Sequence, residues 1–412
     1  MLLSTLVRRL AVVLALFAAS CGVELALRNP PPAPSDAGAI ISANVTMSGS
    51  ALAPKVGPAV SDGNALAVWA LDGRGELPMP PNTPAAHASN LLVMPPDHPA
   101  ALTAFWFAGD RESAPNVQIA ASQWSRAAQQ WTPAQFVVNR HILGQQLGYG
   151  VRRLGNPVAW IDARGRMHLF VVATGLGGWA ASRVVHLQQN NASWQAGTLE
   201  FEPARGLPLA WLWNTSFLVR NAPLGLADGG MGLPVHFELG LKHAALLQFS
   251  PEGDYLGMVK ISSRHDLLQP AVVMQTPTDW LAFMRVQRPD GRIAVARSSD
   301  AGAHWHDAPD LALRNPDAAV AALAVAPGHM VLAYNPSSTG RTFLLLGQSS
   351  KGSDWSVARA IAQGVGDDEF SYPAIAWDQN RLWVSYTVDR KRIAWQRFRM
   401  VPANALPTEV RP

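Results

Sequence analysis

Ser298-Ser-Asp-Ala-Gly-Ala-His-Trp305 follows a short apolar run and has the spacing S-x-D-x-G-x-x-W. In such a stretch the serine and aspartate side chains can bond nearby backbone N–H groups, and the glycine supplies the positive φ that a tight turn needs. The closing tryptophan can then fold back and pack between sheets. The stretch therefore predicts a tight hairpin turn between two strands of a β-rich fold.

Weaker copies of this turn recur along the chain, in residues 123–131, 188–194, 250–255 and 349–355. The closing aromatic residues lie 50 to 63 residues apart and are Trp131, Trp194, Tyr255, Trp305 and Trp355. A repeat of this length fits one four-stranded propeller blade. Five turns of this kind, together with final strands between Tyr372 and Phe398, predict six blades.

Short β-type runs separated by Gly, Pro, Asp and Asn fill the rest of the chain, which has no long apolar stripe of helical period. Examples are residues 157–161, 167–172, 271–274, 280–284, 293–296, 330–334 and 382–386. We therefore predict an all-β fold, a six-bladed β-propeller from about residue 64 to residue 400. A C-terminal tail is expected over residues 401–412.

Composition supports a folded globule and argues against nucleic-acid binding. Of the 412 residues, 48% are hydrophobic and 15% are charged, which is typical of a chain with a large core. The formal net charge is only +4, and no run of five basic residues occurs. The 15 tryptophans require either a large packed interior or a surface on which sugars stack.

The N-terminus reads as an export signal. Arg8 and Arg9 precede a short apolar stretch, and small residues come directly before Cys21, the one cysteine of the chain. This pattern predicts a lipoprotein-type signal peptide over residues 1–21, with Cys21 lipidated. A Pro-rich tether is expected over residues 22–63. Ordinary cleavage or an uncleaved anchor are the alternatives, and all three place the domain outside the cytoplasm, in the periplasm or cell envelope.

From His87 to Phe398 the chain resembles the bacterial sialidase-like (neuraminidase-like) family, whose members carry BNR or Asp-box repeats. The matching stretches are residues 87–92, 107–116, 154–157, 235–238, 269–273, 284–285, 298–305, 334–341 and 369–373. The resemblance implies a six-bladed propeller. It also implies an enzyme that removes a terminal acidic sugar from a glycan, without a cofactor.

The resemblance further implies a defined site. In this family three arginines clamp the sugar carboxylate, a Tyr activated by a Glu is the nucleophile, and an Asp is the general acid. By position, Arg285 and Arg341 match the second and third clamp arginines, and Tyr372 matches the nucleophile.

Three positions depart from the family pattern. His87 stands at the first clamp arginine, Gln269 at the activating Glu, and Asn116 near the acid Asp. Neither amide can titrate, so neither can perform acid–base catalysis. A rearranged site could use Glu238, Asp110 or Glu112 as the titrating group, with Arg111 as an extra clamp cation; these candidates all lie near matched stretches.

Each of these residues also has a structural interpretation, because arginines can form ion pairs between blades and a strand Tyr or His can be part of the core. Three functions therefore stay open. The first is a sialidase-type glycoside hydrolase, the second a non-catalytic glycan-binding propeller, and the third a propeller polysaccharide lyase acting on a uronic acid. We expect a monomer that meets a glycan with a terminal acidic sugar, reaches the membrane through its lipid anchor, and binds no metal or nucleic acid.

Overall fold

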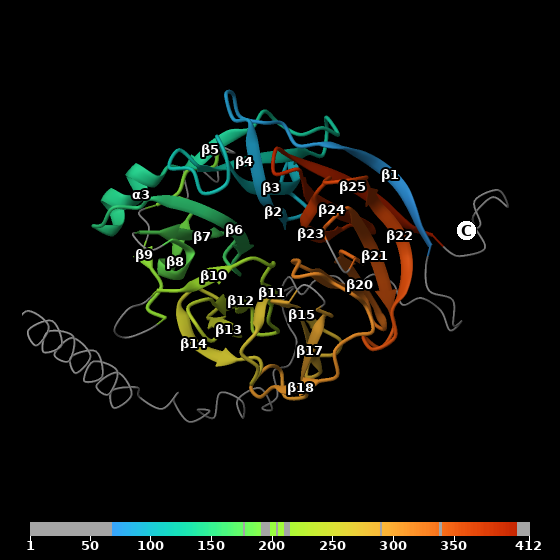
Figure 1. The fold of residues 1–412 in the computed structure, drawn as a ribbon. Coiled ribbons are helices and arrows are strands. Elements are labelled where there is room, and N and C mark those ends of the chain that lie inside the picture. Colours follow the sequence, from blue (N-terminus) through green and yellow to red (C-terminus); the bar gives the residue numbers. More distant parts are fainter. Residues whose placement is uncertain are drawn as a thin grey trace, which may run out of the picture. The chain divides into compact units, whose positions relative to one another are not determined.

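Six antiparallel sheets follow one another along the chain and form the blades of a β-propeller (Figure 1). The computed structural model describes residues 68–175, 178–190, 198–202, 205–209, 215–288, 291–337 and 340–401. All six blades belong to one compact unit. The predicted all-β, six-bladed architecture is confirmed.

The first three blades are built in chain order from the innermost strand outward. Blade 1 consists of β2 (Ala85–Val93), β3 (Ala100–Gly109), β4 (Gln118–Ser125) and β5 (Gln135–Val138). Blade 2 consists of β6 (Arg153–Ile161), β7 (Met167–Thr174), β8 (Ser182–Gln188) and β9 (Arg205–Gly206). Blade 3 consists of β10 (Phe217–Val219), β12 (Met231–Phe237), β13 (His243–Phe249) and β14 (Tyr255–Lys260), with β11 (Leu224–Gly225) paired to β12.

The next two blades repeat this order, and the last blade differs from it. Blade 4 consists of β15 (Leu267–Met274), β16 (Trp280–Val286), β17 (Ala294–Ser298) and β18 (His306–Ala308). Blade 5 consists of β19 (Ala321–Ala326), β20 (His329–Tyr334), β21 (Phe343–Ser349) and β22 (Ser356–Gln363). Blade 6 takes β23 (Phe370–Asp378), β24 (Arg381–Val388) and β25 (Arg392–Val401) from the end of the chain and β1 (Val68–Glu76) from its beginning.

The pairing of β1 with β25 closes the ring of blades (Figure 1). Asp72 of β1 accepts ion pairs from Arg381, Arg397 and Arg399 of blade 6. The sequence did not predict this closure, since the sixth blade was assigned to final strands alone. The predicted segments 1–21, with Cys21, and 22–63 lie outside the described residues.

The turn that predicted the fold joins the third and fourth strands of blade 4. The Ser298 hydroxyl accepts the Gly302 N–H at 2.9 Å, and the Trp305 indole N–H donates to the Gly302 carbonyl at 3.0 Å. Gly302 has φ +82°, and an added Cβ would lie 2.4 Å from the Trp280 ring, so a side chain has no room there. The weaker copies that are described lie at the same connection of blades 1, 3 and 5, while residues 191–194 of the blade 2 copy are outside the described part.

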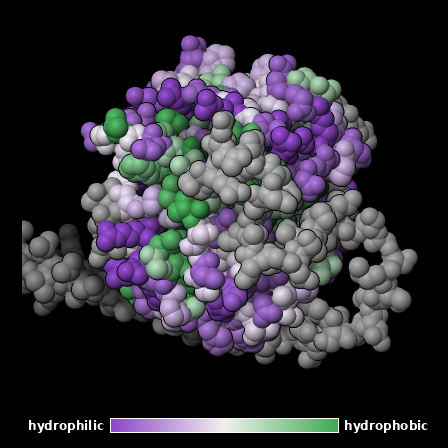
Figure 2. All heavy atoms as spheres, turned by 90° about the vertical axis from the view of Figure 1, so that its right-hand side faces the viewer, coloured by the Kyte–Doolittle hydropathy of each residue, from purple (hydrophilic) through white to green (hydrophobic). Residues whose placement is uncertain are grey.

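The hydrophobic core lies between neighbouring blades rather than in one central mass. Where blade 6 meets blade 1, four tryptophan rings pack together with centroids 5.0 to 6.4 Å apart; five of the six pairs are edge to face and one is tilted, among Trp124, Trp131, Trp383 and Trp395. Such pairs stabilise an interface beyond the area they bury. Much of the tryptophan content therefore serves blade packing. Figure 2 shows hydrophilic side chains over most of one described face, with smaller apolar groups between them.

One described helix, α3 (Arg140–Leu147), connects blades 1 and 2. Asn139 caps its N-terminus by accepting the N–H groups of His141 and Ile142, and Gly148 ends it in the left-handed conformation. Within the described ranges, no helix is long and apolar enough to cross a membrane.

Candidate functional site

The innermost strands of four blades carry a bulge at the same point, where the pairing register shifts. In each bulge one residue other than glycine has a positive φ, between 38° and 53°: Ala88, Asn156, Gln269 and Tyr372. Non-glycine residues adopt this conformation at a cost, and bulges often redirect a side chain at a functional site. Two of the four, Gln269 and Tyr372, are predicted site residues.

Behind these bulges the centre of the propeller is nearly closed. A cavity of about 20 Å³, lined by inner-strand residues such as Asn90, Ala271 and Ala374, remains there. This volume has room for about one water molecule. This cavity is therefore too small to admit a sugar.

Tyr372 is surrounded by nitrogen-bearing side chains. The Gln269 amide donates to its hydroxyl at 3.5 Å, and the His87 ring centroid lies 4.3 Å from its ring centroid. The guanidinium carbons of Arg220 and Arg341 lie 5.1 and 5.8 Å from the ring centroid. The described contacts of the phenol thus include cations and an amide. Gln269 forms the hydrogen bond to the Tyr372 hydroxyl at the position where the family pattern has a glutamate.

Arg285 is held in place by two partners. Its Nε donates to the Asp317 carboxylate at 2.6 Å, and its Nη1 donates to the Gln269 carbonyl oxygen at 3.1 Å. Burial would lower the pKa of Arg285, but the nearby Tyr372 hydroxyl and Asp317 carboxylate outweigh burial and raise it. The guanidinium is therefore a fixed charge beside the Tyr372 hydroxyl.

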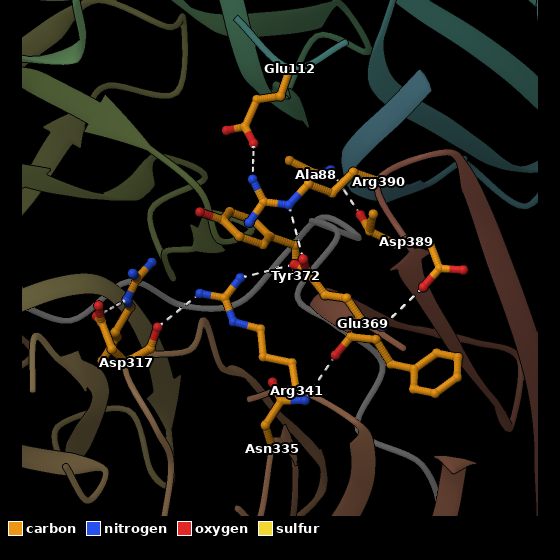
Figure 3. Close-up of polar contacts among 12 residues, drawn as sticks. Ala88, Glu112, Asp317, Asn335, Arg341, Glu369, Tyr372, Asp389 and Arg390 are labelled. Atoms are coloured by element: carbon orange, nitrogen blue, oxygen red, sulfur yellow. Dashed lines mark hydrogen bonds and ion pairs between the residues drawn. The ribbon is translucent and has the colours of Figure 1, made fainter. Parts of the chain in front are cut away.

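Arg341 belongs to a chain of alternating charges that runs outward from the pocket (Figure 3). Its Nη1 donates to Glu369 at 3.1 Å, and its Nη2 donates to the Asp317 carbonyl at 2.9 Å. Arg390 donates to the other oxygen of Glu369 at 2.9 Å and to Glu112. These bonds fix both guanidiniums in position before any ligand arrives, which reduces the ordering that binding requires.

The Glu369 carboxylate is ionised at any moderate pH. Burial would raise its pKa, but the hydrogen bond from Arg390 and the charges of Arg390 and Arg341 overcome that effect and lower the pKa to about 2. Glu369 therefore orients the arginines and does not act as a proton donor.

His87 does not supply the positive charge of the clamp arginine whose position it occupies. Its side chain is buried, and within the described residues neither ring nitrogen has a hydrogen-bond partner. Burial, followed by the charge of Arg390, lowers the pKa of His87 well below its usual value, so the ring is neutral. It packs edge-on against Phe107, with ring centroids 5.4 Å apart, and at a tilt against Tyr372.

Glu238 follows the end of β12 and pairs with His236, Nε2 to Oε2 at 3.4 Å. The His236 hydrogen bond lowers the pKa of Glu238, burial opposes it, and the charges of His236, Lys242 and Arg285 add to the lowering. Glu238 is therefore an ionised carboxylate that feels the charge of Arg285.

Asp110, Arg111 and Glu112 line an open cleft of about 660 Å³ beside the pocket, together with the turn Asp389–Lys391. Asn116, in the same β3–β4 loop, accepts the Asp110 backbone N–H at 3.3 Å. Glu112 is bound to Arg390, whereas the Asp110 side chain is exposed. The structure thus brings Arg285, Arg341, Gln269, His87 and Tyr372 together and places the β3–β4 loop candidates at the cleft.

Several residues at the site escaped the sequence analysis: Arg220, Asp317, Glu369 and Arg390. Arg220 is only 2% exposed, donates to the Ser89 and Pro373 carbonyls at 3.3 and 2.8 Å, and has no carboxylate partner among the described residues. Burial lowers the pKa of Arg220 to about 10, partly offset by the charge of Tyr372. Only Glu369 had a local signal, since it begins the matched stretch Glu369–Pro373.

The described residues contain no group of three or more His, Cys, Asp or Glu side chains placed to hold a metal ion. The site itself brings together four arginines, a tyrosine, a neutral histidine and the carboxylates of Asp317, Glu369 and Glu238. This set can bind and orient an anion such as a carboxylate.

Comparison with known proteins identifies a family that has the same kind of repeat. The profile of the BNR repeat-like domain family matches residues 100–384, and no curated protein matches the chain. Among solved structures the chain is similar to Hadza microbial sialidase Hz136, with TM-score 0.63, 15% identity, and coverage of 79% of this chain and 67% of that one.

Two further solved structures have the same fold at low identity. Trypanosoma rangeli sialidase in complex with the inhibitor DANA gives TM-score 0.59 and 14% identity over 76% of this chain, which spans 55% of that enzyme. A protein of unknown function from Dyadobacter fermentans gives TM-score 0.61 and 13% identity over 81% of this chain and 99% of its own. With the family profile matched over more than half of its length, this chain belongs to the family of proteins with a BNR repeat-like domain.

Proposed function

We propose that the site around Tyr372 binds the terminal acidic sugar of a glycan, with Arg285 and Arg341 holding the sugar carboxylate. The observation that carries this proposal is the convergence of both guanidiniums on Tyr372, each fixed by a protein oxygen partner. Solved structures of the similar Trypanosoma rangeli sialidase include complexes with sialic acid and with DANA. A carboxylate is the anion whose planar geometry suits a guanidinium fork.

The same site favours binding over rapid turnover. Gln269 donates its amide to the Tyr372 hydroxyl and cannot accept the proton of that hydroxyl. General base catalysis is worth roughly 10²- to 10⁴-fold in rate, so a tyrosine nucleophile without a base reacts slowly. We therefore propose a glycan-binding propeller whose sialidase-type hydrolysis is weak.

Efficient hydrolysis is the second candidate, and Glu238 is the observation in its favour. Its carboxylate is ionised and lies within electrostatic reach of Arg285. If a bound glycan places a water molecule against Glu238, this carboxylate can act as the general base, a role that Gln269 cannot perform.

Binding of a sialyl glycoside, measured by titration calorimetry beside hydrolysis of a fluorogenic sialoside, tests the proposal. We expect measurable binding, slow hydrolysis, and loss of hydrolysis in Tyr372→Phe. Arg285→Lys should weaken binding by about 10-fold or more, because an ammonium cannot replace the planar fork. Arg288→Lys is the matched control, since Arg288 is an exposed arginine three residues further along that pairs with Asp266.

Equal losses in Arg285→Lys and Arg288→Lys would contradict a specific carboxylate contact. Rapid hydrolysis that Tyr372→Phe abolishes would establish the second candidate. A rise in near-ultraviolet absorbance with a uronic acid polymer would instead reveal the unsaturated product of a lyase.

We also propose that the protein is exported and anchored in the cell envelope through Cys21, which rests on the sequence pattern before that residue. Two acyl chains give stable membrane attachment, whereas a cleaved, unlipidated chain is released. Cys21→Ser is therefore expected to move the protein from the membrane fraction to a soluble one and to abolish its labelling by a tagged fatty acid. Labelling that survives in Cys21→Ser would overturn this assignment.

A further inference from the structure

The open cleft beside the pocket lies between the β3–β4 loop of blade 1 and the turn Asp389–Lys391 of blade 6, and has a volume of about 660 Å³. We infer that this cleft binds the sugar next to the terminal acidic residue, and that it selects glycans in which this neighbouring sugar also carries an anionic group, a carboxylate or a sulfate. The inference rests on the proposed function, because it names the glycan class of the same site.

The cleft and the pocket share a wall. Glu369 accepts Arg341 on one carboxylate oxygen and Arg390 on the other, and Arg390 also binds Glu112 in the cleft (Figure 3). Arg390 lies close enough to the pocket that its charge acts on both His87 and Tyr372. A ligand whose carboxylate meets Arg341 can therefore extend past Arg390 into the cleft.

The walls of the cleft are fixed before a ligand arrives. The Arg390 carbonyl accepts the Ala86 N–H at 3.1 Å, and the Asp389 carboxylate accepts the Glu369 N–H at 3.0 Å. Asp389 and Arg390 both have a positive φ, 51° and 56°, which residues other than Gly, Asn and Asp seldom adopt. A strained arginine kept in a turn that glycine would suit better is consistent with a role for its side chain.

The charges that are free to meet a ligand in the cleft are mostly positive. Glu112 and Asp389 are engaged by Arg390 and by a backbone N–H, and Arg390 keeps its second terminal nitrogen and 46% side-chain exposure. Arg111 and Lys391 are exposed, and no partner of either side chain is recorded among the described residues. Asp110 is the one exposed carboxylate that lines the cleft without such a contact, so an anionic neighbour is favoured over a neutral one.

The cleft lacks the feature that usually recognises a neutral neighbouring sugar. Uncharged sugars commonly stack on an aromatic ring, and none of the residues lining the cleft is aromatic. The lining consists of charged side chains with Pro84, Ala85 and Ser113. Its chemistry therefore suits an anion with hydroxyl groups around it.

Titration calorimetry with three sialosides tests this inference on the whole protein. One probe carries a neutral neighbouring sugar, the second a second sialic acid, and the third a sulfated galactose. We expect at least one of the two dianionic probes to bind about tenfold more tightly than the neutral one, since each exposed ion pair is worth only a modest factor. Whichever dianionic probe binds more tightly identifies the anion.

The double variant Arg111→Gln, Lys391→Gln should bring the ratio of the dissociation constants close to one. Arg392→Gln should leave the ratio unchanged, because Arg392 is an exposed arginine that pairs with Glu76 on the neighbouring strand. Equal affinity of the unmodified protein for all three probes, or a preference that persists in the double variant, would overturn the role of the cleft while the proposed function stands. Failure of all three probes to bind would overturn both.

Discussion

Replacing Gln269 by Glu is expected to raise hydrolysis of a fluorogenic aryl sialoside by about 100-fold, because a carboxylate at this position can take the proton of the Tyr372 hydroxyl. The geometry favours the exchange. Gln269 is 5% exposed, its nitrogen lies 3.5 Å from the Tyr372 hydroxyl, and its oxygen already accepts Arg285 at 3.1 Å. Glu has nearly the same shape, so one oxygen can keep the Arg285 bond while the other faces the phenol.

The choice of substrate separates the missing base from the missing acid. An aryl group leaves without being protonated, whereas an alkyl sugar needs a general acid, and Asn116 cannot serve as one. The gain in Gln269→Glu should therefore be large with the aryl sialoside and small with an alkyl sialoside. Initial rates on both substrates give this comparison directly.

Two further variants make the result specific. Gln269→Glu combined with Tyr372→Phe should return to background, because the restored base then has no hydroxyl to activate. Gln287→Glu adds the same charge at an exposed position in blade 4 and should have no effect. An unchanged rate in Gln269→Glu, in a protein that still binds sialoside, would mean that the base is not what limits turnover and would favour a pocket evolved for binding alone.

The sequence predicted the blades well because their signals are local. The closing turns of blades 4 and 5 each place Ser, Gly and Trp within eight residues, and the hydrogen bond from the glycine N–H to the serine hydroxyl recurs in blade 5 between Gly352 and Ser349. The closure by β1 could not be predicted in this way. The pairing of Val68 with Val401 joins opposite ends of the described chain, and no local pattern specifies which edge a strand will meet.

The residues of the candidate site were likewise predicted only where a local sequence pattern identified them. Arg285, Arg341 and Tyr372 were found because they stand in matched stretches, and the structure brings them together. Arg390 was missed because Asp389-Arg-Lys-Arg392 reads as an ordinary charged turn. Arg220 was missed because the burial of a lone arginine depends on how several blades meet around it.

A second group of buried polar side chains lies away from the site and makes stability depend on pH. His168 contacts His186 at 2.8 Å through one ring nitrogen and Asp162 at 3.1 Å through the other, inside blade 2. His186 stacks on Phe170 with ring centroids 4.6 Å apart. Burial, followed by the charges of His168, Arg205 and Arg166, lowers the pKa of His186 to about 3. His186 is therefore neutral in the folded protein at any pH above that value.

This shift predicts a loss of stability in mild acid. An unfolded histidine binds a proton below pH ~6.5, whereas folded His186 does not bind one until the pH is near 3. The contribution of His186 to the free energy of unfolding is therefore complete above pH ~6.5 and is lost as the pH falls towards about 3. The slope is about 1.4 kcal/mol per pH unit, so this one residue should remove ~2–3 kcal/mol of unfolding free energy between pH 7 and pH 4.5. His186→Gln keeps a hydrogen-bond partner for His168, because the amide can donate or accept, and it cannot titrate, so this variant should lose ~2–3 kcal/mol less unfolding free energy than the unmodified protein over the same interval.

Urea unfolding at both pH values measures the difference, and comparison with the unmodified protein cancels the groups that titrate in both. His265→Gln replaces an exposed histidine and should show the unmodified dependence on pH. If His186→Gln and the unmodified protein lose equal stability in acid, then His186 is protonated within the folded blade, and the buried chain from Asp162 to His186 tolerates a charge. If the variant loses less stability in acid than the unmodified protein, the neutral His186 imidazole is the group that makes blade packing depend on pH. Its partner His168 also contacts blade 3, because a Cβ added at Gly253 in the turn of that blade would lie 2.3 Å from the His168 ring.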